Sequence, residues 1–252
     1  MAGQSERLLT LEQEVQSLRA QVAGGEARLL EQERQLERSE ADLRQSLDQE
    51  RERATELRNS YVATVRALGN AVEARDAYTG KHAERVAAYA LRMARASGSP
   101  LATDAEIEFG FLLHDVGKVA VPDAILFKPQ PLHAAERLLM ERHPVTGWEI
   151  LRDVHFLGAA KDVVRSHHER WDGRGYPDGL AGTAIPYSAR LFAVADTLDA
   201  LTTTRPYRNA LTFSRAREII CAAAGSQFDP AAVAAYEQLS DAELSRIQRT
   251  IS

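Results

Sequence analysis

The sequence predicts an all-α protein, with a helical bundle over residues 59–252 and a long N-terminal coiled-coil helix over residues 1–58. Three observations support this fold class. The alternation of apolar and polar residues typical of strands is nearly absent, and the run VAV at 119–121 is too short to build a sheet. Residues 5–58 contain no proline and carry apolar residues seven apart. Most of the remaining chain has helical periodicity.

The N-terminal segment is predicted to form a parallel homodimer. Its heptad row consists of Leu8, Val15, Val22, Leu29, Leu36, Leu43 and Leu57. The second row is apolar at Leu11 and Leu18 but lapses at the Gly24-Gly25 pair and resumes in a shifted frame at Leu47, so the pair indicates a break or stutter. Because a helix with one narrow apolar stripe is marginal alone, dimerisation is favoured. A solvated single helix and a hairpin folded at the glycines are the alternatives.

The bundle is predicted to contain eight helical stretches, the first continuing from the coiled coil. Thr103 and Glu106 have capping-box spacing at the start of the second stretch, and Gly117 can end it. Residues 118–132 and 170–186 are left as long irregular loops, and loops of that length usually serve a function. The helical stretches are 60–96, 104–116, 133–141, 144–154, 159–169, 187–201, 214–224 and 230–249.

Composition limits the function and the setting of the protein. The formal net charge is −5, so no overall positive field attracts DNA or RNA, and an anionic substrate needs a local cluster of cations. The lone Cys221 excludes a disulfide framework within one chain, which favours a reducing cytoplasm. No apolar run approaches the roughly 20 residues of a membrane span, and the start MAGQSERLL lacks a secretory pattern. We therefore expect a soluble, cytoplasmic protein.

Histidines and aspartates recur on several predicted helices. Asp115 follows the apolar run Phe-Leu-Leu, where a charged carboxylate is costly to bury unless it is paired or bound to a cation. Each site has a simpler explanation when taken alone, such as a helix cap, an exposed helix end or a hydrogen-bonded core aspartate. Recurrence on separate helices favours convergence on one centre. The candidate ligands are His114, Asp115, His143, His167, His168 and Asp196.

The ligand types indicate which metals the centre would take. Imidazole and carboxylate without thiolate favour iron or manganese, with nickel or catalytic zinc as alternatives. Four histidines and two aspartates exceed the needs of one ion, so we expect two divalent ions bridged by a carboxylate. Such a pair is the usual apparatus for phosphoester hydrolysis by a metal-bound hydroxide. Lys118, four residues after His114, is expected on the same helix face.

The motifs together resemble one known family. From about Ala71 to Ala235 the chain is similar to the HD-GYP family of bacterial cyclic di-GMP phosphodiesterases. The resemblance implies an HD-type helical bundle that hydrolyses cyclic di-GMP to pGpG, or onward to GMP. A phosphohydrolase acting on another nucleotide and a nonenzymatic signalling module that binds cyclic di-GMP or a partner protein remain open. The matching motifs are HDVGK at 114–118, VPDAILFKP at 121–129, RHP at 142–144, HHERWDGRGYPDGL at 167–180 and ARLFAVADTLDALTTTRPYR at 189–208.

The resemblance also implies individual roles. It makes the six candidate residues metal ligands, with Asp115 as the bridge. It places Lys118 against the scissile phosphate or the bridging hydroxide. Arg205 and Arg208 are implied to grip the phosphates and the guanine base of the substrate, with a solvated turn as the alternative.

The loop after His168 is expected to form a stiff lip beside the metals. Glycines in it permit the positive φ angles of a tight loop. Glu169 and Asp172 are expected to orient the histidines or to pair with Arg170 and Arg174. Tyr176, in the Gly-Tyr-Pro sequence, is a candidate contact for the substrate or for a signalling partner protein, with a structural turn as the alternative.

One position departs from the pattern of part of the family. Some members hold a third metal with a glutamate four residues before the histidine that aligns with His82, and that position is Tyr78 here. We therefore expect two ions. His82 is a candidate ligand or substrate neighbour, and an exposed histidine on a long helix is the alternative.

Overall fold

The chain, seen here in a computed structural model, folds as two compact units, Met1–Ser60 and Tyr61–Ser252. The structure describes residues 2–75, 81–104, 106–204 and 209–251. The predicted domain boundary between residues 58 and 59 stays a prediction. None of the described helices combines the length and the apolar character that a bilayer crossing requires.

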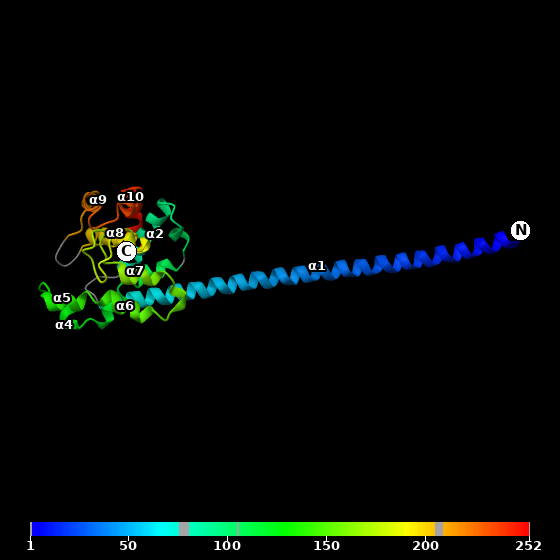
Figure 1. Cartoon of the computed structure of the whole chain (residues 1–252), viewed down its shortest axis with the longest axis horizontal. Coiled ribbons are helices and arrows are strands. Elements are labelled where there is room, and N and C mark those ends of the chain that lie inside the picture. Colours follow the sequence, from blue (N-terminus) through cyan, green and yellow to red (C-terminus); the bar gives the residue numbers. More distant parts are fainter. Residues whose placement is uncertain (1, 76–80, 105, 205–208, 252) are drawn as a thin grey trace. The chain divides into compact units, whose positions relative to one another are not determined.

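Helix α1 (Ala2–Glu73), drawn in blue where it begins in Figure 1, forms the first unit up to Ser60, and its last residues belong to the second unit. The helix runs through Gly24 and Gly25 without a break, so the alternative of a hairpin folded at the glycines is wrong. Its described heptad positions are exposed, among them Val22, Leu29 and Leu36. An exposed apolar row is the surface that a coiled-coil partner covers, and the homodimer stays a prediction.

The second unit is all-α, as the sequence predicts. Its described residues form no strand, and only isolated bridges join Asp172 to Ala181 and Ala224 to Phe228. Its α-helices are α2 (His82–Ala96), α3 (Ile107–Leu112), α4 (Asp123–Leu126), α5 (Ala134–Met140), α6 (His143–Leu151), α7 (Ala160–Ser166), α8 (Tyr187–Thr202), α9 (Phe213–Ala222), α10 (Pro230–Glu237) and α11 (Asp241–Thr250), and its short 3-10 helices are η1 (Pro100–Thr103), η2 (Val116–Ala120), η3 (His155–Leu157) and η4 (Gly182–Ala184).

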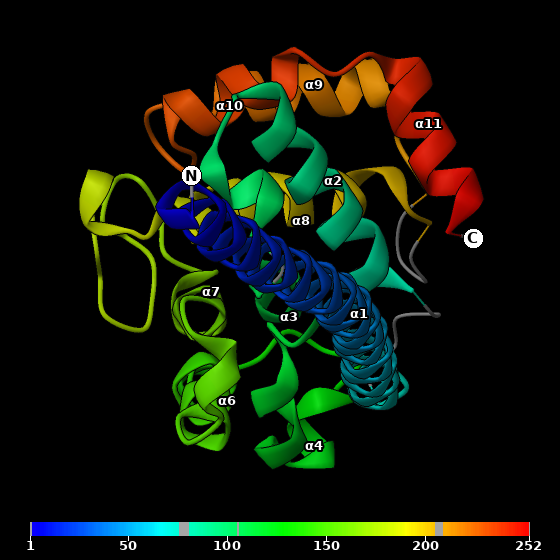
Figure 2. The same cartoon turned by 90° about the vertical axis from the view of Figure 1, so that its right-hand side faces the viewer.

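The helices of this unit are stacked around α2 and α8, which pack against each other. Figures 1 and 2 agree that α9 and α10 lie on one side of this pair and α6 and α4 on the other. Helix α7 contacts α3, α6 and α8. The core face of α8 is fully buried at Leu191, Phe192 and Leu198, and each such side chain stabilises the fold by roughly 1.5–3 kcal/mol. Of the candidate ligands, His167 and His168 directly follow α7, and the others lie on or next to the elements that α7 contacts.

The predicted single helix over residues 60–96 is wrong. Helix α1 ends at Glu73 and α2 begins at His82, after Lys81 with a φ of 68°. A left-handed residue cannot continue a helix, so the chain must restart there. The carboxylate of Glu73 accepts a hydrogen bond from the backbone N–H of Ala83, and thus satisfies a free N–H in the first turn of α2.

The second predicted helix is shorter than expected, and the capping box at its start is wrong. The Thr103 hydroxyl donates to the Pro100 carbonyl, while the Asp104 carboxylate accepts from the backbone N–H of Glu106. Helix α3 ends at Leu112. His114 and Asp115 therefore lie in the turn between α3 and η2, not inside a helix, and Lys118 reaches them from η2.

Other predicted stretches are divided more finely. The stretch 230–249 is two helices, because Ser240 and Glu243 form a reciprocal capping box that starts α11. The predicted loop 118–132 contains the end of η2 and all of α4, and the loop 170–186 contains η4.

Candidate metal centre

Four of the six predicted ligands lie together. Asp115, His143, His167 and His168 each offer a ligand atom, and these atoms all lie within 4.8 Å of one another. Asp115 comes from the turn before η2, His143 from the start of α6, and the two adjacent histidines from the end of α7. The structure thus brings together four of the predicted side chains from three separate segments.

Three histidines are oriented by the same kind of local hydrogen bond. In each, Nδ1 donates to the backbone carbonyl oxygen three residues earlier. Because a carbonyl can only accept, the proton must sit on Nδ1, and Nε2 of the neutral ring presents a lone pair. This is the usual way in which a metal-binding imidazole is held. The bonds join His114 to Phe111 at 3.0 Å, His143 to Met140 at 2.8 Å and His167 to Val164 at 2.9 Å.

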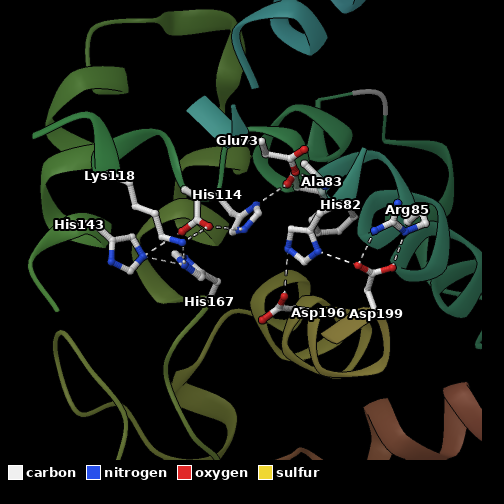
Figure 3. A network of polar contacts seen from close by, with 12 residues as sticks. Glu73, His82, Ala83, Arg85, His114, Lys118, His143, His167, Asp196 and Asp199 are labelled. Carbon is white, nitrogen blue, oxygen red and sulfur yellow. Dashed lines mark hydrogen bonds and ion pairs between the residues drawn. The ribbon is translucent and has the colours of Figure 1, made fainter. Parts of the chain in front are cut away.

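The Nε2 atoms converge on the Asp115 carboxylate. Nε2 of His114 lies 3.1 Å from Oδ2, and Nε2 of His143 lies 3.2 Å from Oδ1. Nε2 of His167 lies 3.8 Å from the same Oδ1 and 3.2 Å from Nε2 of His143. Figure 3 shows His143 and His167 close together, with Lys118 beside them. The Lys118 ammonium lies 2.8 Å from Oδ2 of Asp115.

These contacts fit a cation better than they fit hydrogen bonds. Oδ1 of Asp115 is buried and accepts no hydrogen bond of regular geometry from the described residues. The nearby Nε2 atom of His143 carries no proton in the tautomer that its Nδ1 contact requires. Lone pairs therefore face lone pairs, an arrangement that a divalent ion stabilises and that is costly without one.

The protonation states suit metal binding. Burial by itself raises the pKa of Asp115, but the charges of His114 and Lys118 hold that pKa well below its usual range. Burial and the charge of His168 place the pKa of His167 well below its ordinary value. Burial and the charge of His143 lower the pKa of His168 to about 4. At neutral pH the site thus presents an anionic carboxylate at Asp115 and neutral imidazoles at His167 and His168, the forms that bind metals.

Asp196 does not join the four clustered residues. Its Oδ1 lies 3.3 Å from Nε2 of His82, whose Nδ1 lies 2.8 Å from Oδ2 of Asp199. Arg85 binds Asp199 through Nε at 2.7 Å and Nη2 at 3.0 Å. Figure 3 shows these side chains on the opposite side of His114 from His143. The rings of His82 and His114 are 5.6 Å apart, so the two groups adjoin.

His82 is buried rather than exposed, so its simpler alternative is wrong. Burial lowers the pKa of His82, yet hydrogen bonds to Asp196 and Asp199 raise it to about 10. Sequence reasoning missed Arg85 and Asp199. A usable pattern was present, because Arg85 lies three residues after His82 and Asp199 three residues after Asp196, so each pair shares a helix face.

The lip after His168 is held by its own side chains. Glu169 accepts from the backbone N–H groups of Asp178 at 2.7 Å and of Leu180 at 3.0 Å, so it braces the loop and does not orient a histidine. Asp172 pairs with Arg170, as expected, at 3.1 and 2.9 Å. The ring of Tyr176 stacks on His168 with centroids 4.7 Å apart.

Gly117 serves a different purpose from the predicted helix end. A Cβ atom at this position would lie 1.9 Å from the carbonyl oxygen of His143 and 2.5 Å from the nitrogen of Gly147. Only glycine lets the backbone of η2 approach α6 so closely. The same approach brings Asp115 to His143.

A cavity of about 280 Å³ opens beside the cluster. Its lining includes the predicted ligands His167, His168 and Asp196, together with Tyr176. The remaining lining residues are Glu141, Glu169, Arg170, Arg174, Gly175, Ala193, Thr197 and Gln227. Arg205, Arg208 and Tyr78 lie outside the described residues.

The fold and the cluster define an all-helical domain with a histidine and aspartate site suited to divalent cations. The family model described as HD domain matches residues 66–232, and the chain belongs to this family. The resemblance to the HD-GYP family is confirmed.

Several curated proteins are similar in sequence. A 3′3′-cGAMP-specific phosphodiesterase of Vibrio cholerae is 43% identical over 69% of this chain and 34% of its own length. A cyclic di-GMP phosphodiesterase response regulator of Xanthomonas campestris is 38% identical over 90% of this chain and 55% of its own length. A cyclic di-GMP phosphodiesterase of Thermotoga maritima is 36% identical over 77% and 53%. The chain thus spans between a third and just over half of these relatives.

Solved structures share the fold. The crystal structure of a cyclic GMP-AMP specific phosphodiesterase of V. cholerae superposes with a TM-score of 0.56 at 20% identity, covering 75% of this chain and 50% of that one. A protein from Bdellovibrio bacteriovorus superposes with a TM-score of 0.53 at 20% identity, covering 71% and 63%. At this identity the likeness concerns the fold alone.

Proposed function

We propose that this chain is a metal-dependent phosphodiesterase that hydrolyses cyclic di-GMP to pGpG, with GMP as a further product. The main support is the convergence of imidazole lone pairs on the buried Asp115 carboxylate beside a cavity. Relatives named cyclic di-GMP phosphodiesterases in Xanthomonas and Thermotoga support the substrate.

The proposal assigns the metals to the predicted ligands. His114, His143, His167 and His168 would bind through nitrogen, with Asp115 as the bridging carboxylate and Asp196 completing the set after leaving His82. Two ions, iron or manganese in preference to nickel or zinc, suit this donor set. When bound, such ions supply an activated water and neutralise the phosphate charge.

The chain's own residues then bind and orient the substrate. The Lys118 ammonium, 2.8 Å from Asp115, lies where it would offset negative charge on the phosphate as the bond to the 3′ oxygen breaks. Tyr176, braced against His168, forms one wall of the cavity. His82 contacts Asp196, which lines the cavity, and we propose it as a neighbour of the substrate. Arg205 and Arg208 are proposed to bind the phosphates or the base.

The test combines metal content with product identity. Purified chain loaded separately with iron, manganese, nickel or zinc is incubated with cyclic di-GMP, and products are separated by chromatography. We expect close to two ions per chain and accumulation of pGpG. Absence of bound metal after loading, or intact cyclic di-GMP in every sample, would overturn the proposal.

A second candidate substrate is 3′3′-cGAMP. The observation that favours it is the 43% identity to a V. cholerae phosphodiesterase named for that substrate. Comparing kcat/KM for the two cyclic dinucleotides on one preparation decides between them.

We also propose that α1 forms a homodimer and that the lip around Tyr176 can contact a signalling partner protein. A cytoplasmic location, predicted from the lone cysteine, belongs to the same proposal. Leu36→Asp, in the heptad row, should give a monomer in sedimentation equilibrium. Ala41→Asp adds the same charge five positions on, outside both apolar rows, and should leave the dimer intact. A wild-type chain that sediments as a monomer would rule the dimer out.

A further inference from the structure

The cavity beside the Asp115 site has charged walls that the proposed hydrolysis does not use. Two of its charged residues already have partners: Arg170 is neutralised by Asp172, and Glu169 is occupied by backbone N–H groups of the lip. Glu141 and Arg174 differ from them. Within the part of the chain that the structure describes, their side chains make no hydrogen bond or ion pair.

Hydrogen bonds hold the backbone of both residues in place. Glu141 caps the C-terminal end of α5, where its N–H donates to the carbonyl of Arg137 at 2.8 Å. The N–H of Arg174 donates to the Asp172 carboxylate at 3.1 Å. The attachment points are therefore set while the charged ends remain available to a ligand.

We infer that Glu141 and Arg174 recognise a guanine base of the cyclic dinucleotide, an inference that rests on the proposed function for its substrate class. A carboxylate beside a phosphodiester would repel it, so Glu141 needs a ligand edge that donates hydrogen bonds. Guanine offers N1–H and the N2 amino group side by side. Its O6 and N7 acceptors match the forked guanidinium of Arg174.

Adenine does not meet the same requirements. Its N1 is an acceptor, so a carboxylate aimed at that edge would face a lone pair. Its N6 amino group replaces the O6 acceptor that an arginine needs. A site with this pair of charges therefore favours guanine and disfavours adenine, because an unmatched polar group in a pocket is costly.

The size of the cavity fits recognition of one base. Its volume of about 280 Å³ is near the lower limit of ligand pockets, roughly 300 Å³. One nucleotide half of a cyclic dinucleotide would enter, with its phosphate toward His167 and His168, while the other half remains outside.

The test measures base selectivity by binding, on the full-length metal-loaded chain. A ribose-labelled fluorescent cyclic di-GMP is displaced by unlabelled cyclic di-GMP or cyclic di-AMP. Selectivity is the inhibition constant of cyclic di-AMP divided by that of cyclic di-GMP. We expect Glu141→Gln and Arg174→Ala each to reduce this ratio by about 10- to 100-fold, mostly by weakening cyclic di-GMP. Arg174→Lys, which keeps the charge but loses the fork, should lie between.

Matched controls use neighbours outside the cavity. Arg137→Ala and Glu149→Gln make the same charge changes on exposed positions and should leave the ratio within about twofold. Both constants come from one preparation, so a partly unfolded variant changes the signal amplitude but not the ratio. An unchanged ratio in both cavity variants would overturn the inference. Equal weakening of both dinucleotides would also overturn it.

Hydrolysis is scored separately by chromatography. If the chain binds cyclic di-GMP selectively without cleaving it, the proposed enzymatic function is refuted. The selectivity ratio tests base recognition independently of that result.

Discussion

The Asp115 cluster, which joins Asp115 to His114, His143, His167 and His168, and the Asp199 network, which joins His82, Arg85, Asp196 and Asp199, use the same residue types to opposite effect. In the network every charge faces an opposite charge, and the pKa of His82 is raised to about 10. In the cluster one carboxylate faces several imidazoles, and the pKa of His168 is lowered to about 4. The network is complete as it stands, whereas in the cluster Lys118 meets only Oδ2 of Asp115 and the buried Oδ1 accepts no hydrogen bond from the described residues.

The difference lies in the partners of the ring nitrogens. In the cluster, backbone carbonyls take the Nδ1 protons and leave lone pairs at the centre. In the network, carboxylates face both nitrogens of His82, so that ring favours two protons and offers no lone pair. Recognising a metal site therefore requires the hydrogen-bond partner of each histidine in addition to its position.

The largest expected effect is the loss of the carboxylate at the centre of the cluster. Asp115→Ala removes the bridge, so bound metal should fall to background and kcat/KM by well over 100-fold, since even supporting residues around a metal cost about 10- to 100-fold. Elemental analysis and product chromatography measure both. Asp153→Ala, at an exposed position, is the control. Retention of full activity by Asp115→Ala would show that the bridging assignment is wrong.

The network should respond mainly through stability. Asp199→Ala leaves Arg85 and His82 buried without their carboxylate, and breaking a buried pair from one side costs about 3–5 kcal/mol. Urea denaturation measures the loss. Asp241→Ala breaks the more exposed pair with Arg217 and should cost less than about 1 kcal/mol. Metal content should fall less than in Asp115→Ala; equal loss would mean that cluster and network act as one site.

The close approach of η2 to α6 should matter to the cluster more than to the network. Gly117→Ala forces a Cβ atom into the backbone of His143, and overpacking of this kind costs about 1–3 kcal/mol. The displaced Asp115 should also bind less metal. Gly25→Ala, with open space around it in α1, should be neutral or stabilising. Normal metal content and stability in Gly117→Ala would remove the packing argument.

A further expected effect is a pH dependence of the network in metal-free protein. Because the folded pKa of His82 is about 10 and the unfolded value about 6.5, its contribution is complete below pH 6.5 and is lost as pH rises toward 10. The free energy of unfolding should fall by at most about 1.4 kcal/mol per pH unit over this range. Denaturation curves of wild type and His82→Gln, compared from pH 6 to 10, measure the difference. If the free energies of unfolding of the two proteins changed in parallel with pH, the raised pKa of His82 would be contradicted.

The sequence predicts the helices well where apolar periodicity is continuous, as over residues 187–201, which closely match α8 (Tyr187–Thr202). It fails at ends that depend on distant residues. The break after Glu73 and the early end of α3 at Leu112 could not be foreseen, because the hydrogen bond from Ala83 to Glu73 and the packing of Gly117 on His143 are contacts between separate elements, which local periodicity does not contain.

By itself the sequence determined the fold class, the family and the kinds of ligand atom available, because periodicity and residue chemistry are properties of local sequence. Only the tertiary structure decided which nitrogen of each histidine presents a lone pair, and that Asp196 faces His82 and not the residues of the Asp115 cluster. The physical reason is that protonation and orientation follow from hydrogen-bond partners. For His82 those partners, Asp196 and Asp199, lie more than 100 residues further along the chain.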